Sequence, residues 1–257
     1  MSLPLNSIVI PPAQGHPHTH TVIFLHGRGD DNGPFRDAAL LGQKWRDSRG
    51  RSMAEALPTF RWVLPQAPMR TLVNQPPPGG ASCRIWFDNW NVRDLTEREK
   101  VQADGLREVI PLLRDLVSLE TERLGGGVVV AGFSQGGAAG AHLLFNSDRP
   151  LAAFMGFSCR CPFAGRSLSQ MREVVGVQDG VPDHDDFLRD TPLLLEHCVD
   201  DPIVPLESGR VLRDVMRGFG CDVDAKEYPD GGHWLHSPTG LDDVVKFLEK
   251  NVIGKGA

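Results

Sequence analysis

The sequence of 257 residues carries 27 Lys and Arg against 33 Asp and Glu, a formal net charge of −6. This negative charge, without a long Lys/Arg cluster, argues against nucleic acid as a partner, because binding the phosphate backbone needs a basic surface. No apolar stretch approaches the roughly 20 residues that span a bilayer, and the N-terminus lacks a basic region before an apolar one. We therefore expect neither a transmembrane segment nor a secretory signal.

Short apolar runs alternate with helical patterns along the chain, as in a parallel sheet covered by helices. The length fits one large α/β domain, and we expect residues 1–257 to form a single domain. In chain order, the predicted strands are His20–Leu25, Arg61–Leu64, Gly127–Ala131, Leu151–Phe157, Pro192–Cys198 and Asp222–Tyr228. Several of them are continuously apolar, as strands buried on both faces must be.

Apolar residues at helical spacing predict helices at Glu97–Leu119, Gln135–Phe145, Pro205–Phe219 and Leu241–Asn251. We expect Pro111 to kink or split the first helix and Thr239 to cap the last. Pro205 and Gly220 are the expected start and stop signals of the third helix. Two segments resist assignment: Asp37–Leu57, a candidate helix, and Arg160–Asp190, a long charged excursion that is either a lid or a plain insertion.

The five cysteines are odd in number and lack a repeated CxxC spacing, which argues against a disulfide framework and a zinc site. Reduced thiols, and with them a cytoplasmic location, are the simplest interpretation. Cys159 and Cys161 would share one face of a strand, but we favour buried or incidental thiols over a redox pair. His16, His18 and His20 alternate without a carboxylate or thiol cluster nearby, so we favour a solvated segment over a metal site.

The run VVVAGFSQGGAAG at 128–140 contains G-x-S-x-G between a predicted strand and a small-residue helix. A serine at such a turn has a strained backbone and an exposed hydroxyl, and glycines at 132 and 136 avoid the clashes that Cβ atoms would cause. We therefore predict that Ser134 is a nucleophile and that the Gln135 N–H, at the helix N-terminus, donates to an oxyanion. The similar run GFSCR at 156–160 has Arg160 in place of the second glycine, so we reject Ser158.

A serine hydroxyl needs a base within hydrogen-bond reach and a third group that orients the base. His233 lies in a glycine-rich segment after the last predicted strand, and Asp200 and Asp201 directly follow the strand before it. The order Ser, Asp, His is the one expected of an α/β-hydrolase, and the carboxyl ends of parallel strands meet at one edge of the sheet. Taken singly, Asp201 is a turn former and His233 a solvated loop residue, but the ordered set favours a catalytic triad.

The run HGRGD at 26–30 directly follows the first of the predicted strands. Glycines on both sides of Arg28 allow a backbone N–H to point into the site as a second oxyanion donor. His26 is better explained as a structural hydrogen-bonding residue, because it lies in the wrong loop for the base. Aromatic residues gather near the presumed site, where a core role and a substrate-lining role are equally supported: Trp86, Phe87, Trp90 and Trp234.

Six motifs occur in this order between about residues 20 and 248: HTVIFLHGRGD, VLPQAPMR, IWFD, GFSQGG, DPIVP and GGH. Together they resemble the acyl-protein thioesterase, lysophospholipase and carboxylesterase family of α/β-hydrolases. The resemblance implies an α/β-hydrolase fold, with a mostly parallel central sheet and helices on both faces. It implies a cytosolic serine hydrolase of esters or thioesters that uses neither a metal nor an organic cofactor. The site residues it implies are the nucleophile Ser134, the acid Asp201, the base His233, the backbone N–H groups of Arg28 and Gln135 as oxyanion hole, and Trp86 as a substrate-binding residue.

Two departures from the family pattern concern the substrate. Arg28 stands where family members usually carry leucine, and SCRCP at 158–162 replaces a more usual small turn. We expect a small-molecule ester or an acylated protein as the substrate, cleaved through an acyl-enzyme. The alternatives are a small-molecule esterase of specialised metabolism and, less favoured, a catalytically silent hydrolase-fold binding protein.

Overall fold

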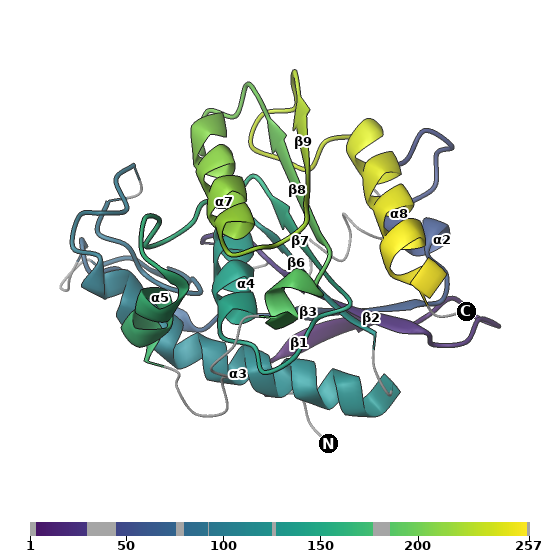
Figure 1. Ribbon diagram of the computed structural model, residues 1–257, viewed down its shortest axis with the longest axis horizontal. Helices are drawn as coiled ribbons and strands as arrows, with labels where there is room; N and C mark the ends of the chain where they lie inside the picture. Colours follow the sequence, from purple (N-terminus) through teal and green to yellow (C-terminus); the bar gives the residue numbers. More distant parts are fainter. Residues whose placement is uncertain are drawn as a thin grey trace.

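The computed structural model describes residues 4–29, 45–75, 80–91, 93–124, 127–176 and 186–255. Its centre is a seven-stranded sheet in the order β1-β3-β2-β6-β7-β8-β9 (Figure 1). β1 pairs with β3 in the antiparallel direction, and every other neighbouring pair is parallel. The strands are β1 (Ser7–Ile10), β2 (His20–Leu25), β3 (Phe60–Pro65), β6 (Val128–Phe133), β7 (Ala153–Phe157), β8 (Leu193–Cys198) and β9 (Val223–Tyr228).

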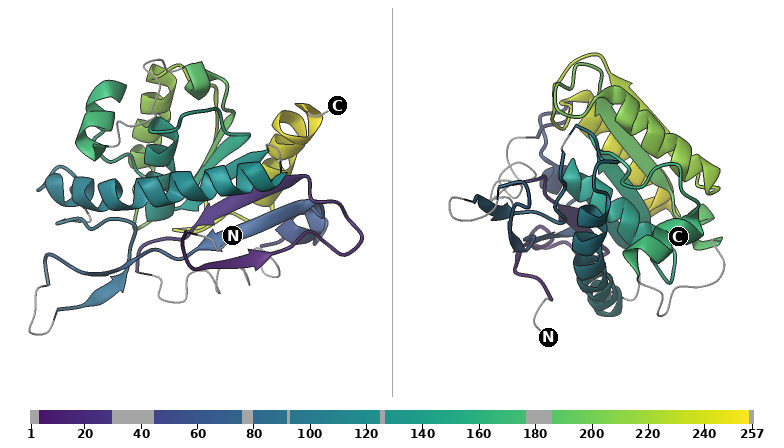
Figure 2. Two further views of the ribbon diagram at one scale, coloured as in Figure 1. Left: turned by 90° about the horizontal axis from the view of Figure 1, so that it is seen from below. Right: turned by 90° about the vertical axis from the view of Figure 1, so that its left-hand side faces the viewer.

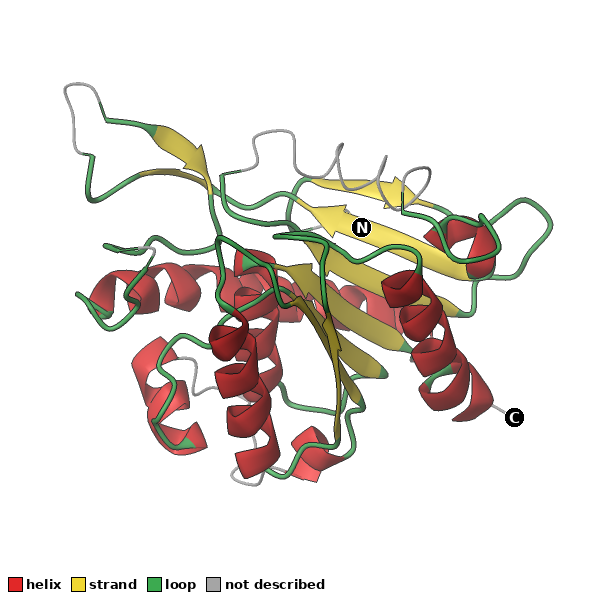
Figure 3. Cartoon of the chain, turned by 90° about the horizontal axis from the view of Figure 1, so that it is seen from above, coloured by secondary structure: helices red, strands yellow, loops and turns green. Residues whose placement is uncertain are grey.

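All six strands predicted from the sequence are present, with ends that differ by a few residues. The pattern missed β1, a short edge strand that pairs only with β3 and is half-buried along its length. It also missed a separate hairpin of β4 (Met69–Thr71) and β5 (Ser82–Arg84), which extends away from the main sheet (Figure 3). β1 is only four residues long, and the β4–β5 hairpin lacks the continuous apolar runs that mark the central strands.

The two faces of the sheet are covered by different helices (Figures 1 and 2). Successive side chains of a strand point to opposite faces, so Ile23 and Leu25 join one core while Val22 and Phe24 join the other. The first core also contains α3 (Lys100–Leu124), α4 (Gln135–Phe145), α5 (Leu168–Val175), α6 (Asp186–Arg189) and α7 (Leu206–Gly218); the second contains α2 (Met53–Ala56) and α8 (Thr239–Asn251). A 3₁₀ turn, η2 (Ile253–Lys255), follows α8.

The four predicted helices are present, with two corrections. Pro111 does not split α3, which runs on to Leu124; the apolar stripe around Pro111 is buried against the core, and this packing offsets the hydrogen bond that proline removes. Thr239 is not a cap, because it is already the first residue of α8 and makes no side-chain cap hydrogen bond. Gly220 ends α7 as expected, with a φ of 85°.

The two unassigned segments are described only in part. In Asp37–Leu57, residues up to 44 lie outside the described residues, and α2 begins after Ser52 with a reciprocal Ser52–Glu55 capping box. In Arg160–Asp190, residues 177–185 lie outside the described residues, while α5 packs against α3 and α4. The lid interpretation of this segment therefore stays a prediction.

The described helices include none with a stretch long and apolar enough to cross a lipid bilayer. The shared sheet, with β1 at one edge and β9 at the other, supports the proposal that the chain forms one domain. The parallel strands β2, β6, β7 and β8 end at one edge of this sheet, and the segments that follow them carry the residues singled out from the sequence.

Candidate active site

Ser134 occupies the turn between β6 and α4, with φ 54° and ψ −116°. L-residues rarely adopt this backbone conformation, and the surrounding structure must hold it in place. A Cβ at Gly132 would lie 2.4 Å from the carbonyl carbon of Gly136, and one at Gly136 would lie 2.2 Å from the carbonyl oxygen of Leu25. Only glycine fits at these two positions, which allows the turn to pack directly against the end of β2.

The structure brings Ser134, His233 and Asp201 into one hydrogen-bonded chain. The Ser134 Oγ lies 3.0 Å from His233 Nε2, and His233 Nδ1 lies 2.8 Å from Asp201 Oδ2. A carboxylate can only accept, so Nδ1 carries the proton and Nε2 is free to accept the proton of the hydroxyl. The three residues come from segments that follow β6, β8 and β9, which end at the same edge of the sheet.

Asp201 is held in its ionised form. Its side chain has no exposed surface, and burial alone would raise its pKa. Hydrogen bonds from His197 and His233, and from the backbone N–H groups of Val204 and Ile203, oppose burial and lower the pKa well below its usual value. Both backbone N–H groups donate to Oδ1 at 2.8 Å, which leaves Oδ2 for His233.

Asp200 has a different partner from Asp201. Its Oδ1 accepts a hydrogen bond of 2.8 Å from the backbone N–H of Gly232. Gly231 and Gly232 have φ values of 123° and 64°, a region that favours glycine, and His233 follows them directly. Asp200 therefore fixes the loop that carries His233, whereas Asp201 contacts the imidazole itself.

Gln135, the first residue of α4, faces the segment that contains Trp86. Its backbone N–H is one of the N-terminal amides that find no carbonyl within their own helix. Its side chain connects the start of α4 to the segment of Trp86 and Phe87. Oε1 accepts a hydrogen bond from the Trp86 N–H at 3.0 Å, and Nε2 donates one to the Phe87 carbonyl at 2.7 Å. The sequence analysis missed this side-chain role, which no local pattern signals.

His26 and Trp86 support the loop that contains Arg28. His26 Nδ1 donates to the Gly27 carbonyl at 2.8 Å, and its Nε2 accepts from the Ala67 N–H at 3.0 Å. The Trp86 Nε1 donates to the His26 carbonyl at 2.8 Å. Both ring nitrogens of His26 are thus engaged in fixing the loop, as the structural interpretation of His26 predicts.

Trp86 requires a correction, because its side chain is completely buried and is absent from the pocket walls. Trp86 supports the loop of Arg28 through its hydrogen bond to the His26 carbonyl, and the neighbouring Phe87 lines the pocket instead. The chain bends at both residues, and the Trp86 side chain turns into the core while that of Phe87 reaches the cavity. The sequence motif located the segment without showing which side chain faces the substrate.

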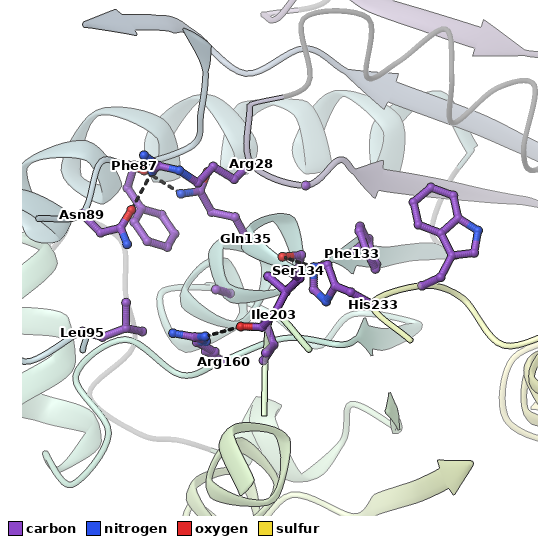
Figure 4. A pocket seen from close by; sticks show the side chains of 14 residues that line it. Arg28, Phe87, Asn89, Leu95, Phe133, Ser134, Gln135, Arg160, Ile203 and His233 are labelled. Carbon is purple, nitrogen blue, oxygen red and sulfur yellow. Dashed lines mark hydrogen bonds between the residues drawn. The ribbon is translucent and has the colours of Figure 1, made fainter. Parts of the chain in front are cut away.

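A cavity of about 390 Å³ opens beside Ser134 (Figure 4). Its walls combine apolar side chains with a few polar ones, as is typical of small-molecule sites. The lining residues are Gly27, Arg28, Phe87, Asn89, Leu95, Phe133, Ser134, Gln135, Ala138, Arg160, Ile203, Val204, His233 and Trp234. Ser134 and His233 therefore open onto a space that can hold a substrate.

The sequence analysis did not identify Arg160 as a lining residue. Its guanidinium donates to the Ile203 carbonyl at 2.7 Å, which holds the side chain across the end of β8. The sequence did contain a signal for this position. Arg160 follows the predicted strand that becomes β7, and β7 lies next to β6, so both strands end at the edge of the sheet where Ser134 lies. Of the described residues in 160–190, Arg160 lines this cavity.

Ser158, the serine of the rejected motif, has no access to solvent. It is buried at 1% exposure, and within the described residues its hydroxyl has no hydrogen-bond partner. Among the described residues no base is hydrogen-bonded to Ser158, whereas His233 is hydrogen-bonded to Ser134. None of the five cysteines is in a disulfide. The described residues contain no group of three His, Cys, Asp or Glu side chains able to hold a metal ion, at His16, His18 and His20 or elsewhere.

A family model described as phospholipase/carboxylesterase matches residues 6–252 of this sequence. The chain belongs to that family. It is 30% identical over 252 residues to acyl-protein thioesterase 1 of Gibberella zeae, covering 95% of both chains. It is 29% identical over 212 residues to acyl-protein thioesterase 1 of Schizosaccharomyces pombe, covering 80% of this chain and 78% of the relative.

Solved structures with the same fold include a thioesterase from maize. The crystal structure of Zea mays acyl-protein thioesterase 2 matches with a TM-score of 0.73 at 24% identity, over 96% of this chain and 99% of that one. Esterase PE8 matches with a TM-score of 0.66 at 23% identity, over 96% and 99%. The α/β-hydrolase fold predicted from the sequence is confirmed, and this member of the phospholipase/carboxylesterase family is a hydrolase of esters or thioesters.

Proposed function

We propose that this hydrolase cleaves carboxylic esters or thioesters through a Ser134–His233–Asp201 triad and a covalent acyl-enzyme. The observation that carries the proposal is the hydrogen-bonded chain from Ser134 Oγ through both nitrogens of His233 to Asp201. Each group has the protonation state that acyl transfer needs: a hydroxyl that donates, an imidazole that accepts at Nε2, and an ionised carboxylate behind it.

In the first half-reaction, His233 removes the Ser134 proton as Oγ attacks the carbonyl carbon. Asp201 holds the imidazole in place and stabilises its charged form, which develops as the tetrahedral intermediate forms. The backbone N–H groups of Arg28 and Gln135 donate to the intermediate's oxyanion. His233 then gives its proton to the leaving alcohol or thiol, and the acyl group stays on Ser134.

In the second half-reaction, His233 removes a proton from a water molecule, which attacks the acyl-enzyme. His233 then returns this proton to Ser134 Oγ as the bond between Oγ and the acyl carbon breaks, which releases the carboxylic acid and restores the enzyme. Phe133 packs against the imidazole with ring centroids 4.8 Å apart, and the His233 side chain is 17% exposed. This arrangement keeps one edge of the base accessible to water while the ring stays fixed.

For the substrate we propose a carboxylic ester or thioester of a small molecule or of an acylated protein. Curated relatives are named acyl-protein thioesterases, which supports the acylated protein. The arginines in the cavity support a small-molecule substrate. The cytoplasmic location stays a prediction from the sequence.

The test is hydrolysis of 4-nitrophenyl octanoate and labelling by a fluorophosphonate, on wild type and on Ser134→Ala. We expect wild type to turn over the ester and to accept one label per chain, and Ser134→Ala to lose both while keeping its melting temperature. A label that persists in Ser134→Ala would place the nucleophile elsewhere. A wild type that neither hydrolyses esters nor takes the label would be the catalytically silent binding protein.

A further inference from the structure

His197, the next-to-last residue of β8, lies beside the carboxylate of Asp201 and is 6% exposed. Its Nε2 lies 2.8 Å from the Val204 carbonyl oxygen and 3.4 Å from Asp201 Oδ2. A carbonyl can only accept, so Nε2 carries a hydrogen in either protonation state of the ring. This one N–H therefore faces both the Val204 carbonyl and the same oxygen of Asp201 that His233 contacts.

The turn from Asp201 to Val204 is held at both polar groups of Val204. The Val204 N–H donates to Asp201 Oδ1 at 2.8 Å, and the Val204 carbonyl accepts from His197. His197 thus fixes the residue that fixes the carboxylate. Burial raises the pKa of Asp201, and the interaction with His197 is the largest of those that lower it. The imidazole of His197 therefore affects both the position and the charge of Asp201.

The ring of His197 is held in turn by α7, which packs over β8 (Figure 1). A Cβ added at Gly209 would lie 2.4 Å from His197 Nδ1, a distance at which the ring or the helix has to move. Glycine weakens a helix interior relative to alanine, so its presence here is explained by this close approach. The helix limits movement of the ring away from Asp201.

We propose that His197 is a positioning residue of the triad, whose Nε2–H holds the Asp201 carboxylate in place for His233. Positive charge develops on His233 in the transition state, and a carboxylate that is already in place stabilises this charge without moving first. His197 is not among the residues that line the described cavity, so it acts through Asp201 on the chemical step. This inference rests on the proposed function and adds a fourth residue to that site.

The test is a double-mutant cycle, with kcat and KM for 4-nitrophenyl octanoate measured on wild type, His197→Met, Asp201→Asn and the double variant. We expect His197→Met to lower kcat by about 10- to 50-fold, the range for a hydrogen bond shared with a charged group. KM should change by less than about threefold, because substrate binding is untouched. In the Asp201→Asn background the same substitution should lower kcat by less than about threefold, since an amide there no longer assists His233.

Milder changes at the same ring supply a second test. His197→Gln places an amide N–H near the position of Nε2, so its kcat should stay within about fivefold of wild type. Gly209→Ala presses a Cβ against Nδ1 and should lower kcat, although alanine is the better helix former. Gly218→Ala, on the same helix with nothing within 4 Å of its Cβ, should leave kcat unchanged. Should His197→Met fail to fold, Gly209→Ala replaces it in the cycle with Asp201→Asn.

His142 provides a matched control for the loss of a buried histidine. It has no exposed surface, and its Nε2 donates to the Pro162 carbonyl at 3.1 Å, so it makes the same kind of hydrogen bond as His197. It lies in α4, more than two turns beyond Ser134. His142→Met should lower the melting temperature and leave kcat within about twofold of wild type, because no triad residue is held by this bond.

The inference is overturned if His197→Met lowers kcat by the same factor in both backgrounds, because a merely structural role acts equally in each. It is also overturned if His197→Met raises KM without lowering kcat, or if His197→Gln loses as much as His197→Met. These outcomes leave the proposed function intact, since Asp201→Asn alone reports on the acid. An Asp201→Asn variant that keeps kcat within about tenfold of wild type would instead contradict the proposed triad, and the inference with it.

Discussion

Replacing Asp201 with Asn should reverse the tautomer of His233. The backbone N–H groups of Ile203 and Val204 both donate to Oδ1, and in Asp201→Asn they keep the amide oxygen at that position. The amide NH₂ then takes the place of Oδ2 and points at His233 Nδ1, where it can only donate. The imidazole must carry its proton on Nε2, which leaves nothing to accept the proton of Ser134.

The size of the effect follows from the lost charge. Asp201 has no exposed side-chain surface, and its Oδ2 lies 2.8 Å from His233 Nδ1, so the two charge centres of the catalytic ion pair are close. Two unit charges about 4 Å apart interact by about 4 kcal/mol at an effective dielectric constant of about 20. Loss of this stabilisation in the transition state lowers kcat/KM by about a thousandfold, and the wrong tautomer adds to the loss.

The assay is kcat/KM for 4-nitrophenyl octanoate, with melting temperatures to show that each variant is folded. The matched control is Asp200→Asn, whose amide oxygen can still accept the Gly232 N–H, so we expect a loss of less than about tenfold. If Asp201→Asn stays within tenfold of wild type, or if Asp200→Asn is the more damaged variant, the assignment of the acid is refuted.

Three further predictions concern the scaffold. Gly136→Ala should prevent formation of the turn at Ser134, because its Cβ would lie 2.2 Å from the Leu25 carbonyl oxygen. The control Gly218→Ala places its Cβ where nothing lies within 4 Å, so it should be neutral or stabilise α7 by up to about 1 kcal/mol. Equal melting temperatures of the two variants would contradict this. Burial raises the pKa of Glu196 well above its usual value of 4.5, so its contribution to stability is full below that pH and is lost as the pH rises toward the folded-state pKa. Glu196→Gln should therefore raise the melting temperature more at pH 8 than at pH 5, and a gain equal at both would argue against a buried, protonated Glu196. Gln135→Met removes the hydrogen bonds to the Trp86 N–H and the Phe87 carbonyl and should lower the free energy of unfolding by about 2 kcal/mol in urea titration; no loss would show that these bonds do not hold the segment.

The sequence by itself determined the central sheet and indicated the place of the proposed site. Apolar runs such as VVVAGF mark strands that are buried on both faces, and this pattern is local, so it survives without knowledge of the fold. The spacing of Gly132 and Gly136 around Ser134 is equally local, because each glycine is needed for a contact that the turn itself creates. Ser134, Asp201 and His233 each follow a predicted strand, so their order along the chain could also be recognised from the sequence.

Edge elements were less predictable than central ones. β1 is only four residues long and partly buried, and the β4–β5 hairpin lacks the apolar runs by which the central strands were found. The local rule for proline also gave a wrong prediction at Pro111. The free energy lost with one backbone hydrogen bond is small compared with the free energy gained by burying the long apolar stripe of α3.

Only the tertiary structure decided which of two neighbours faces the site. Asp200 and Asp201 follow the same strand, and the residues alone allow either as the acid; their different partners, the Gly232 N–H and His233, depend on a loop 32 residues away. Trp86 and Phe87 are likewise adjacent, yet one is buried and the other lines the cavity. Arg160 reaches the cavity because β7 lies beside β6 in the sheet. Composition and spacing fix where a segment ends, whereas the direction of each side chain depends on contacts between segments far apart in the chain.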